Sequence, residues 1–282
     1  MQKQINHGGS MKILIAADME GVTGVVHWDQ VNTSHPEYGR FRRLMTGDVN
    51  AAIRGAFEGG AAEVTVTDGH SYSRNILIEE LDPRARLNSG TPSALSMVQG
   101  VDQDVQGVMF VGYHARIGTQ NAILEHTWSD ERVANLWING KQFGESGLNG
   151  AVCGHFGAPV IMIAGDQAVC TETQELFGEV ETAVVKWAAG RFAAECLPPE
   201  VSQKLIQAAA ERAVRRLKAG KAPKPLQVKT PIQVKVDFVQ SEMADKAMIF
   251  PGAKRSERSI EVVAEDMVSA YAAFRALLAM AR

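Results

Sequence analysis

Short apolar runs, each followed by polar or small residues, recur along the first two thirds of the chain. They predict buried β-strands over residues 12–17, 63–67, 105–111 and 159–164, and alternation of apolar and polar residues predicts a further strand over residues 133–138. Between the first two runs, apolar residues recur every four positions from Phe41 to Phe57, which predicts a helix over residues 39–58. Strands that alternate with helices are typical of a layered α/β fold, with a mostly parallel sheet flanked by helices.

The pattern changes after residue 195, where the sequence CLPPE (196–200) indicates a boundary. A helix is predicted over residues 201–219, followed by a basic, proline-containing linker over 218–229. Alternating residues then predict strands at 232–238 and 259–264, and a final helix runs from 264 to the end. We therefore expect an α/β domain over residues 11–195 and a smaller α+β portion over residues 196–282.

Composition and charge exclude several classes of protein. The net charge is −3 and no segment forms a basic stripe, so a nucleic-acid partner is not expected. No stretch reaches the roughly 18 apolar residues of a membrane span. The three cysteines form no CxxC pair, which is typical of a reducing cytoplasm. Residues 1–10 lack an apolar core, so we expect a flexible extension there rather than a signal peptide.

Side chains that commonly bind metals follow three of the predicted strands. Asp18 and Glu20 come after the first strand, His70 after the second and His114 after the third. Because the carboxyl ends of parallel strands meet at one edge of a sheet, these four side chains are expected to lie together. Carboxylates so close to each other repel unless a proton or cation lies between them. Carboxylate oxygen and imidazole nitrogen suit zinc, and a bridging carboxylate can hold two metals about 3.5–4 Å apart.

Each of these residues also has a structural explanation when taken alone. An Asp-x-Glu sequence is more often a solvated loop end, and a single histidine is more often structural than a ligand. The coincidence at three strand ends favours a metal site. Glu145 alone indicates an acid in the first turn of a helix, and His126 alone indicates a loop histidine, so spacing selects neither residue.

Six short blocks, taken in order, resemble the zinc-dependent D-aminopeptidases of the dipeptide-transport-operon type. The resemblance extends from Met11 to near the C-terminus and is strongest as far as Lys186. The blocks are 18–21 (DMEG), 68–71 (DGHS), 112–116 (GYHAR), 125–127 (EHT), 144–149 (GESGLN) and 164–166 (AGD).

The resemblance implies a set of site residues and an assembly. It implies two zinc ions per subunit, with Asp18 bridging them, and it makes His126 the catalytic residue. It also implies a homo-oligomer, a decamer built from two pentameric rings. The implied metal ligands are Asp18, Glu20, His70, His114 and Glu145.

The expected function is that of a two-zinc aminopeptidase, which removes the N-terminal residue of short peptides, D-amino-acid peptides in particular. On chemical grounds we prefer His126 as an acid/base or oxyanion partner of metal-activated water over His126 as a nucleophile. A two-metal phosphohydrolase is an alternative, but Arg116 is the only obvious nearby cation for phosphate. A non-catalytic metal-binding assembly protein is another.

Four further residues are candidates for supporting roles. Asp68 and Asp166 are expected to orient histidine ligands or the substrate amine. Asn149 and Lys186 are weaker candidates for substrate contacts, and a helix-capping amide and a surface lysine are equally acceptable interpretations of them.

Overall fold

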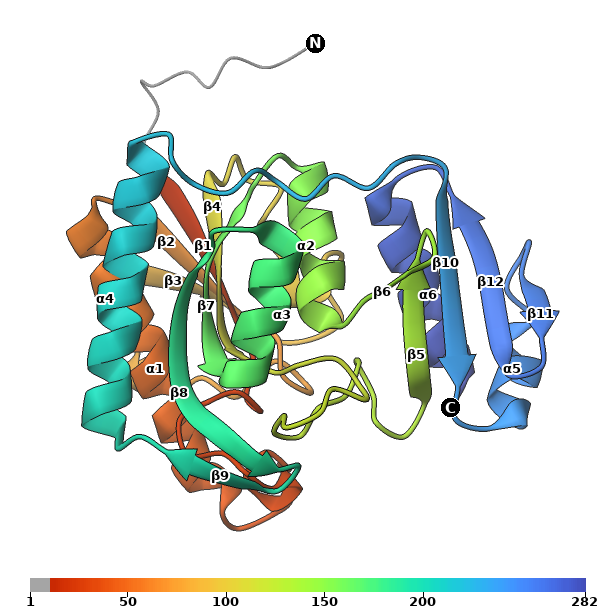
Figure 1. The fold of residues 1–282 in the computed structure, drawn as a ribbon, viewed down its shortest axis with the longest axis horizontal. Coiled ribbons are helices and arrows are strands. Elements are labelled where there is room, and N and C mark those ends of the chain that lie inside the picture. The colour runs from red at the N-terminus through yellow and green to blue at the C-terminus, as the bar shows by residue number, and fades with distance from the viewer. Residues whose placement is uncertain (1–10) are drawn as a thin grey trace.

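The structure is a computed structural model that describes residues 11–282, and these form two β-sheets that lie side by side (Figure 1). The predicted extension over residues 1–10 lies outside the described residues. The larger sheet has the order β3-β2-β1-β4-β7-β8-β9, and every neighbouring pair is parallel except β8 and β9. Its strands are β1 (Lys12–Ala17), β2 (Glu63–Asp68), β3 (Ala85–Asn88), β4 (Gly107–Tyr113), β7 (Val160–Asp166), β8 (Glu181–Gly190) and β9 (Ala193–Cys196).

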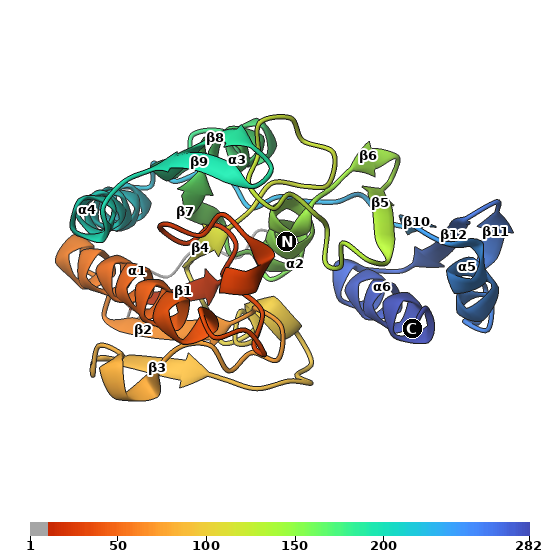
Figure 2. The ribbon, with the colours of Figure 1, turned by 90° about the horizontal axis from the view of Figure 1, so that it is seen from below.

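Helices cover both faces of this sheet. On one face lie α1 (Tyr38–Gly59) and α4 (Pro199–Lys218), which pack against each other (Figure 2). On the other face lie α2 (Glu145–His155) and α3 (Gln167–Phe177). Strand β1 shows how the sequence builds both layers: Ile13 and Ile15 pack toward α1 and α4, whereas Leu14 packs toward α2.

The smaller sheet has the order β11-β12-β10-β5-β6 and is antiparallel throughout. The helices α5 (Ser241–Ala247) and α6 (Met267–Met280) pack on it, and α6 also contacts α2, which joins the cores of the two sheets. Its strands are β5 (Val133–Ile138), β6 (Lys141–Gln142), β10 (Ile232–Phe238), β11 (Lys254–Ser256) and β12 (Ser259–Ala264).

The predicted α/β class is confirmed, but two placements differ from the prediction. Strand β5 pairs with β10 in the smaller sheet instead of extending the parallel sheet, because alternation of polar and apolar residues does not specify a partner. Helix α4 packs on α1, although the boundary at residue 196 assigned it to the C-terminal portion. The division at residue 196 therefore does not follow the division between the sheets.

The shorter elements complete the frame of the site. Three 3₁₀ helices occur in loops of residues 11–282. They are η1 (Trp28–Gln30), η2 (Ile78–Glu80) and η3 (Ser96–Val98). The elements β3, β6, α3, β8, β9, α5 and β11 were not predicted. None of the helices in the described part of the chain is both long and apolar enough to cross a membrane.

Candidate metal centre

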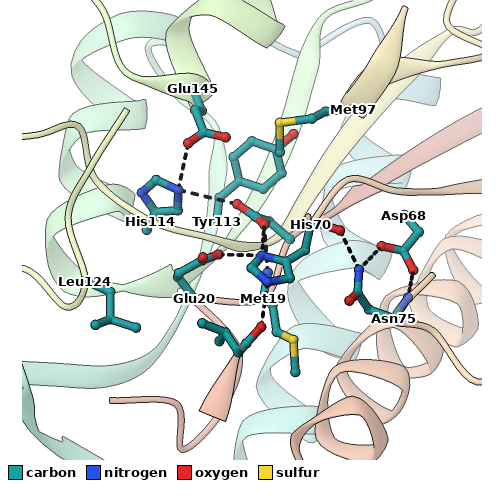
Figure 3. A network of polar contacts seen from close by, with 12 residues as sticks. Met19, Glu20, Asp68, His70, Asn75, Met97, Tyr113, His114, Leu124 and Glu145 are labelled. Atoms are coloured by element: carbon teal, nitrogen blue, oxygen red, sulfur yellow. Dashed lines mark hydrogen bonds and ion pairs between the residues drawn. The ribbon is translucent and has the colours of Figure 1, made fainter. Parts of the chain in front are cut away.

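The structure brings the five expected ligands together at the carboxyl edge of the larger sheet. Figure 3 shows four of them, Glu20, His70, His114 and Glu145. Asp18 directly follows β1, His114 directly follows β4, and His70 lies two residues beyond β2. Glu145 is the first residue of α2, so its carboxylate lies at the positive end of the helix dipole. The acids and His114 are almost completely buried. The predicted convergence of the strand ends therefore occurs.

The carboxylate of Asp18 lies between two histidines. Its Oδ1 atom is 3.4 Å from Nδ1 of His70, and its Oδ2 atom is 3.4 Å from Nε2 of His114. Each histidine also faces a second carboxylate: His70 Nδ1 lies 3.2 Å from Glu20 Oε2, and His114 Nε2 lies 3.0 Å from Glu145 Oε1. The site thus consists of two carboxylate–imidazole pairs that share Asp18.

Backbone carbonyls determine which nitrogen of each imidazole faces the centre. Nε2 of His70 is 2.9 Å from the oxygen of Val31, and Nδ1 of His114 is 3.0 Å from the oxygen of Ala115. Because a carbonyl oxygen only accepts hydrogen bonds, these nitrogens carry the proton of the neutral ring. The opposite nitrogens then point their lone pairs at the carboxylates. This is the arrangement that a metal-ligating histidine adopts.

Two atoms at the centre are buried without a hydrogen bond among the described residues, namely Glu20 Oε2 and His114 Nε2. Both lie close to other polar atoms of the site, but in the neutral tautomers the lone pair of each imidazole nitrogen faces the lone pairs of a carboxylate oxygen. Buried polar atoms are normally paired, so this arrangement needs a cation or extra protons. Donor atoms of Asp18, Glu20 and His114 lie within 4.8 Å of one another, as do those of His114, His126 and Glu145. The residues present therefore fit bound metal.

In the metal-free protein, protons would take the place of the cations. Burial, together with the charge of Glu20, raises the pKa of Asp18 to about 7. Burial by itself would lower the pKa of His114, but the nearby negative charge of Glu145 outweighs it and raises that pKa to about 10. Burial would likewise raise the pKa of Glu20, yet His70 holds it well below its usual range. The centre consequently attracts positive charge.

His126 joins this cluster from the long segment between β4 and β5. Its ring stacks on His114 with a centroid distance of 3.9 Å and an interplanar angle of 11°. Its Nδ1 atom lies 2.8 Å from the oxygen of Leu124, so Nε2 faces Glu145 Oε1 at 3.6 Å. The edge of Trp28 covers the ring at a centroid distance of 5.2 Å. His126 is therefore held beside the metal ligands in one tautomer.

The centre opens into a cavity of about 760 Å³. Asp18, Glu20, His70, His126 and Glu145 line its floor, whereas His114 is not among the lining residues. Residues 128–132 and one side of α6 form the opposite wall, so the cavity lies between the two sheets. A small molecule in the cavity can thus reach the carboxylates of Asp18, Glu20 and Glu145 and the ring of His126 from the same side.

Asp68 and Asp166 hold the loops that carry the histidines instead of touching imidazole rings. Asp68 Oδ2 accepts hydrogen bonds from the backbone nitrogens of Asn75 (2.6 Å) and Ile76 (2.8 Å), and the side chain of Asn75 donates to the oxygen of His70 (2.7 Å). Asp166 caps α3 and accepts a hydrogen bond from the backbone nitrogen of Ile123, three residues before His126, at 2.7 Å. Both residues act on ligand position through the backbone.

Three other candidates do not line the cavity. The backbone nitrogen of Arg116 donates to Glu172, and its guanidinium contacts the oxygen of Ile117. Asn149 donates to the hydroxyl of Tyr113 and accepts from that of Tyr271, within the core. Lys186 is completely buried, in contrast to a surface lysine, and burial lowers its pKa to about 8. The structure gives all three residues internal partners.

Several supporting groups could not be selected from the sequence. The carbonyl of Val31 holds His70, and the backbone nitrogen of Trp128 donates to Glu145 Oε1 at 2.7 Å. Backbone groups leave no signal in side-chain chemistry. Trp28, which packs against His126, and Trp128, which lines the cavity, are visible in the sequence only as aromatic residues in loops.

Buried carboxylates and imidazoles at the open edge of a parallel sheet are typical of metal-dependent hydrolases. The family model described as D-aminopeptidase, peptidase family M55, matches residues 11–276. The D-aminopeptidase of Bacillus subtilis (strain 168) is 34% identical over 273 residues, which cover 96% of this chain and 98% of that protein. The chain therefore belongs to the D-aminopeptidase family, and the expectation of an aminopeptidase-type hydrolase is confirmed at that level.

A solved structure is also closely similar. It is described as a Zn-dependent D-aminopeptidase, DppA from Bacillus subtilis, a self-compartmentalizing protease. It superimposes with a TM-score of 0.92 at 34% identity and covers 96% of this chain and 98% of that one. The α/β fold is thus shared over nearly the whole length.

Proposed function

We propose that this chain is a zinc aminopeptidase that binds two zinc ions and removes the N-terminal residue of short peptides, D-amino-acid peptides in particular. The observation that carries the proposal is the position of Asp18, whose two carboxylate oxygens face His70 and His114 separately. The zinc dependence described for the related structure and the name of the family support it.

Under this proposal the ligands divide into two sets. Glu20 and His70 would hold one ion and His114 and Glu145 the other, with Asp18 shared between them. When bound, such a metal pair polarises the scissile carbonyl and lowers the pKa of bound water from 15.7 toward about 7.

His126 would move the proton in this reaction. The carbonyl of Leu124 keeps the ring proton on Nδ1, so Nε2 is free to accept a proton from the attacking water and to return it to the leaving amine. Trp28 packs against the ring and limits its rotation. The cavity wall formed by α6 would hold the rest of the peptide beside this atom.

Two other roles for His126 lead to different results. As a third ligand beside His114 and Glu145, which its distances allow, it would be needed to retain zinc. As a nucleophile it would form an acyl-imidazole, which rapid quenching followed by mass analysis would trap.

A phosphohydrolase is less consistent with the structure. Arg116 does not line the cavity, and two of the three arginines that do, Arg132 and Arg275, donate to backbone carbonyls. Arg132 donates to the oxygen of Leu278, and Arg275 donates to the oxygens of Ser93 and Ala94. Phosphate would compete with these carbonyls, which argues for an uncharged scissile group.

We extend two further expectations from the same comparison. The related protein is described as self-compartmentalizing, which supports a ring-shaped homo-oligomer here, with a decamer as the proposed state. Light scattering of the purified protein measures this. The three free cysteines support a cytoplasmic location.

The variant His126→Ala tests the proposed function. We expect it to retain two zinc ions per subunit while its kcat on D-aminoacyl peptides falls by about 10²–10⁴-fold. Metal analysis and a screen of short D- and L-peptides measure both quantities. Loss of one zinc would make His126 a ligand, and an unaltered protein without zinc-dependent hydrolysis would end the aminopeptidase proposal.

A further inference from the structure

Lys186 is a buried cation that contacts the loop carrying Asp18 and Glu20. It lies in β8 and is 0% exposed, yet it is not part of the cavity wall. Its Nζ atom donates to the backbone oxygens of Glu20 (2.6 Å), Val22 (3.0 Å) and Val25 (2.6 Å). All three donor hydrogens of the ammonium group are therefore used by one loop.

That loop, residues 18–25, forms no helix or strand. On one side it is held by β4, because the backbone nitrogens of Asp18 and Gly21 donate to the oxygens of Val111 and Gly112, both at 2.8 Å. On the other side, Lys186 donates hydrogen bonds to three carbonyls of the loop. The backbone that presents two metal ligands is thus fixed from two strands of the sheet.

The charge of Lys186 has no carboxylate partner at ion-pair distance within residues 11–282. Asp48, which is also buried, instead accepts a hydrogen bond from the backbone nitrogen of Thr23 at 2.9 Å. A buried ammonium group is much more costly than an apolar side chain of similar size. Simple packing at this position would not require it, whereas the carbonyls of Glu20, Val22 and Val25 need hydrogen-bond donors.

We propose that Lys186 is a positioning residue for the metal centre: its ammonium group fixes the backbone of Glu20, so that the Glu20 carboxylate meets His70 and Asp18. This inference rests on the proposed zinc site. It concerns one half of that site, because Lys186 contacts the Glu20 carbonyl and makes no contact with His114 or Glu145.

The substitution Lys186→Met tests the assignment, because it keeps the length and burial of the side chain and removes both charge and donors. Zinc is titrated away from the purified protein with a chromophoric chelator, which resolves two binding steps. We expect the affinity of one zinc to fall by about 10–100-fold, the usual effect of removing a group that orients a ligand, while the other step changes little.

Two variants accompany this titration. Thr173→Val removes a buried hydroxyl that donates to the oxygen of Val169 within α3 and not to residues 18–25, so it should leave both zinc affinities unchanged. Lys186→Gln keeps two donor hydrogens without the charge, and it replaces Lys186→Met if that protein fails to fold. Circular dichroism confirms that each variant is folded before titration.

The outcomes are distinct. A selective loss of one zinc in the Lys186 variant supports the assignment. Wild-type affinity for both ions in folded Lys186→Met overturns it, and so does an equal loss at both steps, because that result indicates general destabilisation. If the unaltered protein binds no zinc, the proposed function itself fails, and the inference fails with it.

Discussion

Gly21 lies where the ligand loop crosses the end of β4, and replacing it with alanine should damage the metal centre. A Cβ atom at this position would lie 1.9 Å from the oxygen of Tyr113 and 2.6 Å from its carbonyl carbon. Real Cβ contacts are essentially never shorter than 3.0 Å, and the obstructing atoms belong to the backbone, so they cannot rotate away.

The size of the effect follows from this geometry. The loop and the strand must separate by about 1 Å, and each of them carries ligands: Glu20 precedes the clash on the loop, and His114 follows it on β4. A displacement of about 1 Å typically costs about 10²-fold in catalysis. We expect Gly21→Ala to lower kcat/KM for a D-aminoacyl peptide by about this factor and to weaken zinc binding in parallel.

The control is Gly39→Ala in the first turn of α1, where a new Cβ would meet nothing within 4 Å. This variant should keep wild-type activity and gain roughly 0.4–1 kcal/mol of stability, since alanine restricts the unfolded chain. Steady-state kinetics and chelator titration measure both proteins. If Gly21→Ala retains wild-type zinc affinity and kcat/KM, the argument that the backbone contact between loop and strand sets the ligand geometry is wrong.

Three further predictions concern protons, position and stability. Zinc binding should release protons, because Asp18, with a pKa of about 7, and His114, with a pKa of about 10, must lose theirs to bind metal. The affinity for zinc should therefore fall as the pH falls through this range. Calorimetry in buffers of different ionisation enthalpy should show more than about one proton released near pH 7. No buffer dependence would contradict the protonated metal-free centre. Arg191 binds the side chain of Glu125 at 2.7 Å and the backbone of the segment before His126. Arg191→Gln should therefore lower kcat about 10-fold or more while the zinc content stays at the wild-type level. An unchanged kcat would show that Arg191 does not position His126. Zinc removal should lower the free energy of unfolding by about 2.7 kcal/mol relative to the protein with free zinc at 100 times the Kd. Thermal unfolding with and without chelator measures this difference. Equal melting temperatures would show that zinc binding does not stabilise the fold.

The central strands and the first metal ligands could be predicted from the sequence because both depend on local patterns. Strands β1, β4 and β7 are continuous apolar runs, and the polar residues that directly follow β1 and β4 are candidate ligands. The parallel arrangement then brings Asp18 and His114 together without any knowledge of the loops.

The elements that the sequence did not predict correctly depend on contacts between residues far apart in the chain. Strand β5 shows the alternation of a half-buried strand, but its partner β10 lies about a hundred residues later in the chain, so the sequence could not assign it to the smaller sheet. Strand β8 is exposed along part of its length and contains Lys186, so its sequence lacks the continuous apolar run of a buried strand. Lys186 is buried only because the loop after β1 supplies three carbonyls to it.

His126 illustrates the limit for the site. It reaches the centre through an irregular segment in which Leu124 has a φ of 49°, and no periodic pattern places its ring on His114. The family resemblance selected it, whereas spacing did not. Glu145 similarly has the sequence environment of an ordinary first-turn acid, and only the fold turns its carboxylate toward His114.

The central claim is that two zinc ions share the carboxylate of Asp18. X-ray diffraction from crystals of the zinc-loaded protein, collected on both sides of the zinc absorption edge, tests it most directly. We predict two anomalous peaks about 3.5–4 Å apart, one beside Glu20 and His70 and the other beside His114 and Glu145. A single peak, or a peak bound by His126 in place of Asp18, would contradict the account.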